Sequence, residues 1–260
     1  MSKNALITGA SSGIGYELAK RFAEDGTNLV LVARDEARLA QIAKEIQAAH
    51  RVSVKVIRAD LSRAAAPAEV YRETQRASVA VDYLVNNAGF GLGGPFLDTD
   101  LQGELDMLQV NVVSLVHLTK LYLQEMRPRR SGGILNVAST AAFQPGPLMS
   151  IYYASKAFVL SFTEAIAEEL RGSGITATAL CPGPTATDFH RRAKTEGVRL
   201  IKSKAIGMMT AREVAEIGYR GFLQGRVIVI PGLFNKLGAQ SARISPRFAV
   251  RRVVRKLQES

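Results

Sequence analysis

Residues 4–15, NALITGASSGIG, place a glycine-rich loop between a short apolar run and the start of an amphipathic helix. Glycine at positions 9, 13 and 15 lets the backbone approach a pyrophosphate, and the free N–H groups at a helix start bind its charge. A glycine-rich loop at the head of a strand–helix–strand unit is a more specific sign of phosphate binding than a glycine-rich turn elsewhere. The stretch therefore predicts a phosphate-binding βαβ unit.

The rest of the chain alternates short apolar runs with amphipathic helices, which indicates a parallel sheet covered on both faces. The apolar runs predict seven strands, at residues 4–8, 28–33, 52–58, 83–86, 133–137, 176–181 and 226–230. Helical periodicity predicts helices at residues 13–25, 36–49, 67–77, 100–126, 152–171, 211–224 and 246–258. No repeat, low-complexity tract or linker interrupts the pattern, so residues 1–260 are predicted to form one domain.

The charge of the chain is concentrated in two late segments. The chain has 34 basic and 23 acidic residues, for a formal net charge of +11. Residues 190–204 hold six basic residues and one acidic residue, and residues 236–260 hold seven and one. These segments contain neither a recognisable nucleic-acid module nor stacking aromatic residues, so we expect no nucleic-acid partner despite the basic pI.

Composition and cysteine usage favour a cytoplasmic globular protein. Hydrophobic residues make up 47% of the chain, a typical globular value. Cys181 is the single cysteine, so no internal disulfide can form. Only a few residues precede the first strand, which leaves no room for a signal peptide, and no apolar run is long enough to span a bilayer.

Tyr152 and Lys156 are four residues apart at the start of a predicted helix, so both side chains lie on one face. An ammonium beside a phenol stabilises the phenolate and lowers the pKa of the tyrosine. Such a tyrosine can exchange a proton with a carbonyl or an alcohol near neutral pH. By itself the pair also fits a solvated surface contact.

Further motifs follow in a fixed order around this pair. Asn86-Asn87-Ala88-Gly89 ends the predicted fourth strand, Ser139 lies 13 residues before Tyr152, and residues 182–187 read PGPTAT. With these motifs the sequence resembles the classical short-chain dehydrogenase/reductase family over residues 5–231. The resemblance implies a Rossmann-type α/β fold, a doubly wound three-layer sandwich around a seven-stranded parallel sheet.

The resemblance also implies four catalytic residues. Tyr152 would supply a proton, Ser139 would hold the carbonyl oxygen, and Lys156 would bind the nicotinamide ribose and lower the pKa of Tyr152. Asn111 would take part in a proton relay through an ordered water. Asn111 lies on the apolar stripe of its helix, where asparagine is unfavourable unless a buried group needs it, and the alternative is a hydrogen bond to backbone. A serine such as Ser139 after a strand is otherwise most often a turn or helix-cap residue.

The implied dinucleotide site draws on most of the carboxyl ends of the predicted strands. Its residues are Gly9, Ser11, Ser12, Gly13, Ile14, Gly15, Arg34, Asp60, Leu61, Asn87, Ala88, Gly89, Tyr152, Lys156, Pro182, Gly183, Thr185 and Thr187. An NAD enzyme of this family would carry an acidic residue at position 33, where this chain has Ala33. The next residue, Arg34, suits a 2′-phosphate in charge and geometry, which predicts NADP (NADPH) as the cofactor. The alternative is a surface arginine paired with Asp35 or Glu36. We predict no metal site.

The predicted reaction is NADPH-dependent reduction of a small hydrophobic ketone or aldehyde to an alcohol. Alternatives within the family are a 3-oxoacyl-thioester reductase and a hydroxysteroid-type dehydrogenase. A non-catalytic dinucleotide-binding sensor or scaffold is the alternative of another class, and the presence of all four catalytic residue types argues against it. The expected substrate walls are largely apolar: Phe90, Leu92, Phe96, Thr140, Ala141, Phe143, Leu148, Met149 and Phe189.

Two segments remain outside this core prediction. Residues 182–209 resemble the mobile substrate loop of the family and predict a lid, whose positive charge either attracts an anionic substrate tail or is a solvated face. The basic extension at 233–260 departs from tetrameric members, which end soon after the seventh strand, so we expect a homo-oligomer that is a dimer rather than a tetramer. The apolar stripe of helix 246–258 predicts docking on the protein's own core, with covering of the tetramer surface or contact with an anionic membrane as alternatives.

Overall fold

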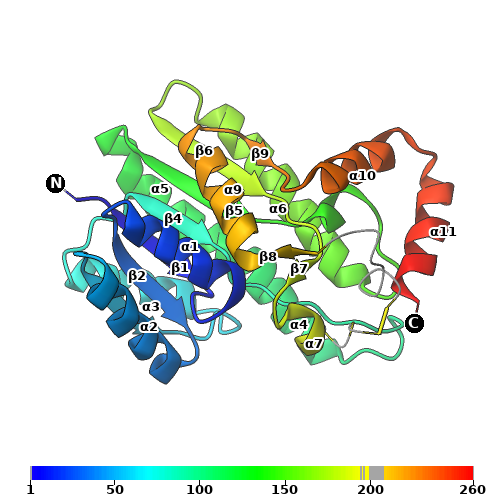
Figure 1. Cartoon of the computed structure of the whole chain (residues 1–260), viewed down its shortest axis with the longest axis horizontal. Coiled ribbons are helices and arrows are strands. Elements are labelled where there is room, and N and C mark those ends of the chain that lie inside the picture. Colours follow the sequence, from blue (N-terminus) through cyan, green and yellow to red (C-terminus); the bar gives the residue numbers. More distant parts are fainter. Residues whose placement is uncertain (1, 194, 196, 199–207, 260) are drawn as a thin grey trace.

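A parallel seven-stranded sheet forms the centre of the computed structural model, which describes residues 2–193, 195, 197–198 and 208–259. The strand order is β3-β2-β1-β4-β5-β6-β9, so the chain reverses direction across the sheet between β1 and β4. Figure 1 shows the strands between two layers of helices. The strands are β1 (Asn4–Thr8), β2 (Asn28–Ala33), β3 (Val54–Arg58), β4 (Tyr83–Asn86), β5 (Gly132–Val137), β6 (Ile175–Leu180) and β9 (Ile228–Val229). This is the doubly wound Rossmann-type α/β sandwich that the sequence predicts.

Strand residues alternate between the two helical layers, because successive side chains point to opposite faces of a sheet. Ala5 and Ile7 pack with the helices of one layer, whereas Leu6 between them packs with the other. The first layer consists of α1 (Gly13–Glu24), α2 (Glu36–Ala49) and α9 (Ala211–Leu223). The second consists of α3 (Ala66–Arg76), α5 (Leu115–Arg129) and α6 (Ser150–Glu169). Both faces are apolar, which explains why the strands read as continuous hydrophobic runs.

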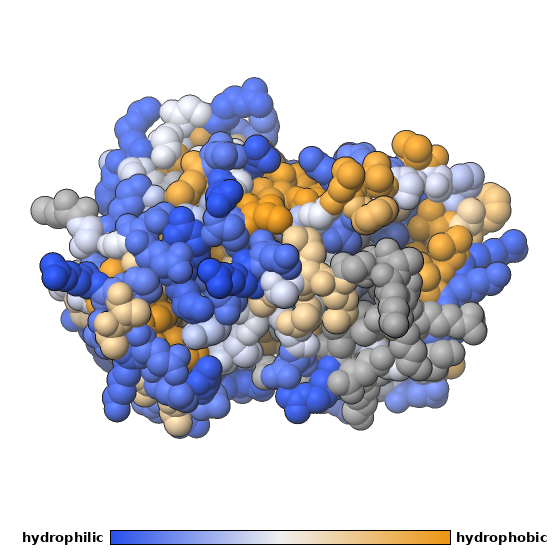
Figure 2. Space-filling model, in the orientation of Figure 1, coloured by the Kyte–Doolittle hydropathy of each residue, from blue (hydrophilic) through white to orange (hydrophobic). Residues whose placement is uncertain are grey.

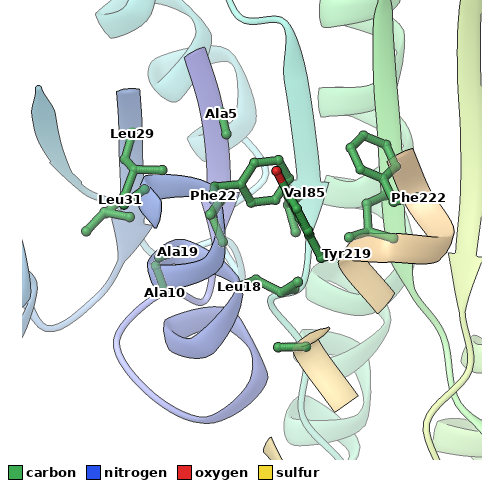
Figure 3. Close-up of a cluster of buried hydrophobic side chains, with 14 of the residues drawn as sticks. Ala5, Ala10, Leu18, Ala19, Phe22, Leu29, Leu31, Val85, Tyr219 and Phe222 are labelled. Carbon is green, nitrogen blue, oxygen red and sulfur yellow. The ribbon is translucent and has the colours of Figure 1, made fainter. Parts of the chain in front are cut away.

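Aromatic packing holds the C-terminal half of α1 in the first helical layer. The Phe22 ring lies edge-on to Tyr219 of α9, with centroids 4.8 Å apart, in the cluster shown in Figure 3. The Tyr219 hydroxyl donates to Asp25 at 2.6 Å, just past the end of α1. Burial of one such aromatic side chain contributes about 1.5–3 kcal/mol. The contact therefore holds the C-terminal half of α1 against the sheet and against α9.

The predicted helix at 100–126 is wrong as a single element. It consists of α4 (Leu101–Leu108), a π-helical segment η1 (Gln109–Ser114) and α5, which runs to Arg129. The Asn111 side chain bonds both backbone groups of Phe90, accepting from its N–H at 3.1 Å and donating to its carbonyl at 3.0 Å. The wider π-helical turn accommodates this link, and such turns occur often at functional sites.

Two helices follow the sheet, where the sequence predicts one. α10 (Leu233–Ile244) precedes α11 (Arg247–Gln258), and the latter matches the predicted basic helix at 246–258. Val250 and Val254 of α11 are buried against Met149 and Tyr153, so its apolar stripe docks on the protein's own core. The seventh strand is also shorter than predicted, with two residues instead of five. None of the helices in the described part of the chain has the length and apolar character needed to cross a membrane.

Short elements complete the region of the predicted lid. These are β7 (Thr185–Ala186), which pairs with β8 (Met209–Thr210), and the helical turn α7 (Phe189–Arg192). Outside this region, another helical turn, η2 (Thr140–Phe143), follows β5. The lid prediction also covers residues 194, 196 and 199–207, which lie outside the described residues.

Candidate active site

A cleft of about 1530 Å³ opens at the carboxyl ends of the strands. It lies where parallel α/β sheets bind ligands, beside the reversal between β1 and β4. The predicted site residues that line it are Gly9, Ser11, Ser12, Gly13, Ile14, Arg34, Asp60, Leu61, Asn87, Ala88, Gly89, Ser139, Tyr152, Lys156, Pro182, Gly183, Thr185 and Thr187. Gly15 and Asn111 do not line it; they lie behind the lining residues.

The glycine-rich loop has no room for side chains on its inner side. Gly9 has φ +66°, and a Cβ there would lie 2.8 Å from Asn87 Nδ2 and 2.9 Å from Ala88 Cα. Asn87 Nδ2 donates to the carbonyls of Thr8 at 2.9 Å and Gly9 at 3.2 Å, which fastens the loop to β4. A Cβ on Gly15 would overlap with both the Asn87 amide and the Gly9 carbonyl.

The start of α1 presents hydrogen-bond donors to the cleft. Ser12 occupies the N-cap position, and its hydroxyl caps no N–H group in the described part of the chain. The first turn contains no acidic residue that would compete for these donors. Free N–H groups and the helix dipole together bind an anion, so this end of the cleft is suited to phosphate.

Sequence reasoning missed Thr8, which joins the loop to the neighbouring strand. Its Oγ1 accepts hydrogen bonds from the N–H groups of Asn87 and Ala88, both at 3.0 Å, and donates to the Val85 carbonyl at 3.3 Å. The signal in the sequence is a polar residue at the end of an apolar strand, directly before Gly9. Thr8 thereby sets the spacing between β1 and β4 at the floor of the cleft.

Tyr152 lies in the first turn of α6, where it is buried and lines the cleft. Burial raises the pKa of its phenol, and the hydrogen bond with the Ser139 hydroxyl opposes this only in part, so the pKa lies well above its ordinary value. The Phe189 ring lies against it, with centroids 5.2 Å apart. The expected lowering of this pKa by Lys156 is not found, because burial dominates.

Lys156 lies one turn further along α6 and is also buried. Its Nζ donates to the Val137 carbonyl at 2.8 Å and lies 5.9 Å from the centroid of the Tyr152 ring. Burial lowers the pKa of Lys156 to about 8, against a smaller opposing effect of the Cys181 thiolate charge. The Lys156 ammonium thus points at the carboxyl end of β5, and it stays mainly protonated at neutral pH.

Ser139 caps a short helical turn and lies beside Tyr152. It precedes η2, and its Oγ accepts from the Ala141 N–H at 3.1 Å, which makes it a helix cap. Its hydroxyl also donates to the Pro182 carbonyl at 3.4 Å and hydrogen-bonds to Tyr152. The cap therefore fixes the hydroxyl beside the phenol.

Asn111 connects η1 to α6 from behind the cleft. Its Nδ2 donates to Ser155 Oγ at 3.1 Å, and that hydroxyl donates to the Tyr152 carbonyl at 2.7 Å. A Cβ on Gly89 would lie 3.0 Å from Asn111 Oδ1 and 3.3 Å from Lys156 Nζ, so these two polar groups approach each other across Gly89. Asn111 thus makes the backbone bonds considered as the alternative, and it also lies next to Lys156.

Arg34 directly follows β2, and its exposed side chain lines the cleft. Among the described residues no acidic side chain forms an ion pair with it; the Asp35 carboxylate instead accepts from a backbone N–H at 2.9 Å as the cap of α2. Burial raises the pKa of Asp60, but hydrogen bonds from Ser62 and the positive charge of Arg34 outweigh it and lower the pKa overall. A cation and an acceptor therefore lie together at this end of the cleft.

The C-terminal helices form a wall that sequence reasoning did not assign to the site. Gln258 Nε2 donates to the Tyr153 hydroxyl at 2.6 Å, next to Tyr152. Of the expected walls, Phe90, Thr140, Ala141, Met149 and Phe189 line the cleft, whereas Leu92, Phe96, Phe143 and Leu148 do not. Instead α10 and α11 supply Phe234, Ala239, Ala242, Val250, Val253, Val254 and Leu257.

A family model for short chain dehydrogenases matches residues 3–197, about three quarters of the chain. The chain belongs to the short-chain dehydrogenase family. It is an oxidoreductase of the group that acts on alcohols and carbonyls with a nicotinamide dinucleotide.

Known short-chain dehydrogenases resemble this one in sequence and fold. The 17-beta-hydroxysteroid dehydrogenase type 3 of Mus musculus is 36% identical over 196 residues, which cover 74% of this chain and 63% of that protein. A short-chain dehydrogenase from Sphingobium yanoikuyae in complex with NADPH has a TM-score of 0.82 and 33% identity, covering 92% of this chain and 94% of that one. One from Burkholderia phymatum in complex with NAD has a TM-score of 0.83 and 27% identity, with 92% of each chain covered.

Proposed function

We propose that the protein is an NADPH-dependent reductase of a hydrophobic ketone or aldehyde, with Tyr152 as the proton donor. The observation that carries this proposal is the buried Tyr152 phenol, held by the Ser139 hydroxyl in the same cleft as an anion-binding glycine loop. The residues fit the dinucleotide, because the start of α1 has neither a side-chain cap nor an acidic residue, and Ser12 and Gly13 at that helix start line the cleft. The bound cofactor supplies the hydride.

Tyr152 is suited to give a proton to a carbonyl oxygen. Its raised pKa keeps the phenol protonated at neutral pH, which is the state that an acid catalyst of reduction requires. Ser139 is fixed by its cap and its bond to Pro182, so its hydroxyl can hold the substrate oxygen beside the phenol. In this assignment, Tyr152 transfers its proton as negative charge develops on that oxygen.

Lys156 and Asn111 are assigned supporting roles for Tyr152, the proposed acid. Lys156 is assigned to the ribose hydroxyls, and its ammonium is oriented by the Val137 carbonyl. Once Tyr152 has given up its proton, the phenolate is the charged form that a nearby ammonium stabilises. Asn111 lies across Gly89 from Lys156, where a water bonded to both would pass a proton back to the site. These assignments follow the family resemblance, and the contacts of Lys156 and Asn111 support them.

Arg34 is proposed to select NADPH over NADH. It lines the cleft, makes no ion pair among the described residues, and is close enough to influence Asp60 electrostatically. A charge-assisted hydrogen bond contributes about 1.5–3 kcal/mol, so Arg34→Ala should raise the NADPH Michaelis constant roughly 10–100-fold. The NADH value should change little, since NADH has no 2′-phosphate. Arg51→Ala, at an exposed arginine that does not line the cleft, is the control.

The substrate is proposed to be a bulky apolar carbonyl compound. The walls near Tyr152 are Phe90, Met149, Phe189 and the valines and leucine of α11, which favour an apolar ligand. The hydroxysteroid dehydrogenase among the relatives bears a name consistent with such a substrate. NADPH oxidation should be measured with aldehydes, diketones, ketosteroids and acyl thioesters. Turnover of bulky apolar ketones with NADPH supports the proposal; turnover confined to small polar carbonyls, or faster with NADH, overturns it.

A further inference from the structure

We propose that the outer faces of α10 and α11, here called the C-terminal surface, dock on an anionic lipid membrane. The surface is defined by exposed apolar and basic side chains of the two helices. The apolar members are Leu233, Phe234, Leu237, Ile244 and Phe248, and the basic members are Lys236, Arg243, Arg247, Arg251, Arg252, Arg255 and Lys256.

The apolar members form a stripe that the protein itself does not cover. Leu233, Leu237 and Ile244 are spaced by four and seven residues, which places them on one side of α10. They are 70%, 57% and 87% exposed, and the neighbouring Phe234 is 73% exposed. Figure 2 shows hydrophobic side chains gathered over α10, at the upper right of the molecule. A contiguous apolar patch of this kind marks an interaction surface.

Basic side chains flank the stripe and indicate the chemistry of the partner. Residues 236–260 contain seven basic residues and one acidic residue. Within the described residues the one ion pair of this surface joins Arg255 to Glu259 at 3.2 Å. Arg252 lies over the Phe248 ring at 5.9 Å, so cation and aromatic face the same side. Amphipathic helices with apolar side chains beside a basic face lie at the surface of anionic bilayers.

Charge also argues against a second copy of the chain as the occupant. A two-fold contact would place seven basic residues opposite the same seven, and like charges repel. A second exposed apolar site, at Leu97 and Leu101, lies among Asp98, Asp100 and Asp106 instead. It has the hydrophobicity of the C-terminal surface without its positive charge and therefore provides a matched control.

The C-terminal surface borders the mouth of the cleft. Phe234 and Val253 line the cleft, yet they are 73% and 56% exposed. Docking would therefore bring the cleft to the membrane, where apolar compounds accumulate. This last consequence rests on the proposed function, whereas docking itself does not, so vesicle binding and NADPH oxidation test the two proposals separately.

Vesicle flotation of the full chain tests the proposal. The vesicles are phosphatidylcholine alone, or phosphatidylcholine with about one third phosphatidylglycerol. The protein should float with the anionic vesicles only, and less so at high salt. Arg251→Gln with Arg252→Gln should weaken binding roughly 30-fold, because each removed charge weakens it about fivefold. Leu237→Ser with Ile244→Ser should weaken it by roughly tenfold or more, as their apolar area no longer enters the interface.

The control and the contrary results are equally specific. Leu97→Ser with Leu101→Ser should bind as tightly as the unaltered protein. The proposal is overturned if the unaltered protein does not bind the vesicles, or if Leu237→Ser with Ile244→Ser has no effect on binding. It is equally overturned if Leu97→Ser with Leu101→Ser weakens binding as much as the changes in α10. It is also overturned if the protein does not bind vesicles and sedimentation shows instead a dimer that Leu237→Ser with Ile244→Ser dissociates.

Discussion

Replacing Lys156 with methionine should stabilise the folded protein at pH 7 and destabilise it at pH 10. Burial lowers the pKa of Lys156 from 10.5 to about 8, so its charged form is disfavoured in the folded state. This penalty is full below about pH 8 and fades as the pH rises towards 10.5. It amounts to about 3 kcal/mol at pH 7 and about 1 kcal/mol at pH 10.

Methionine keeps the length of the side chain but not its charge or its hydrogen bond. The Val137 carbonyl then loses its partner, which costs about 1–3 kcal/mol at either pH. The net change is a gain of about 1–2 kcal/mol at pH 7 and a loss of about 1 kcal/mol at pH 10. The difference between the effects at the two pH values is about 2–3 kcal/mol, and it does not depend on the cost of leaving the Val137 carbonyl without a partner.

Urea unfolding followed by circular dichroism at both pH values measures this difference, provided that the denaturant slope is unchanged. Groups that titrate in both proteins cancel in the comparison. Lys236→Met, which removes an exposed lysine of α10, is the control. A Lys156→Met effect that is independent of pH would refute the reasoning that burial perturbs this lysine.

Two further substitutions probe the loop and the C-terminal wall. Gly15→Ala places a methyl group against the Asn87 amide and the Gly9 carbonyl, at an overpacking cost of about 1–3 kcal/mol. NADPH affinity, measured by calorimetric titration, should therefore fall roughly tenfold, and an unchanged affinity would contradict this. Gln258→Ala leaves the buried Tyr153 hydroxyl without its donor, which should reduce the free energy of unfolding by about 1–3 kcal/mol and lower the melting temperature. An unchanged melting temperature would show that the contact is not made.

Local patterns in the sequence were sufficient to predict the sheet and the cofactor end of the cleft. Buried parallel strands are continuous apolar runs, and the glycine loop is a short stretch of consecutive residues. Both can therefore be predicted from residues that are neighbours in the sequence. Arg34 lines the same cleft, and its role in cofactor choice, which follows from the family resemblance, stays a prediction. These features do not depend on contacts between distant parts of the chain.

The remaining features depend on such contacts. The π-helical turn of η1 arises because Asn111 bonds the backbone of Phe90, 21 residues away, and no pattern within the helix indicates it. Gln258 reaches Tyr153 across 105 residues. The effect of Lys156 on Tyr152 was predicted from charge alone, whereas burial, which the sequence does not show, dominates both pKa values. α10 was missed because its apolar side chains are exposed and give no core-facing signal.

The central claim is that the Tyr152 phenol supplies the proton in an NADPH-linked carbonyl reduction. Tyr152→Phe keeps the ring that packs against Phe189 and removes only the hydroxyl. With a ketone turned over by the unaltered protein, the rate of NADPH oxidation should fall by about 10²–10⁴-fold, while NADPH affinity measured by titration stays within about twofold. Turnover near that of the unaltered protein, with the same NADPH affinity, would contradict the account.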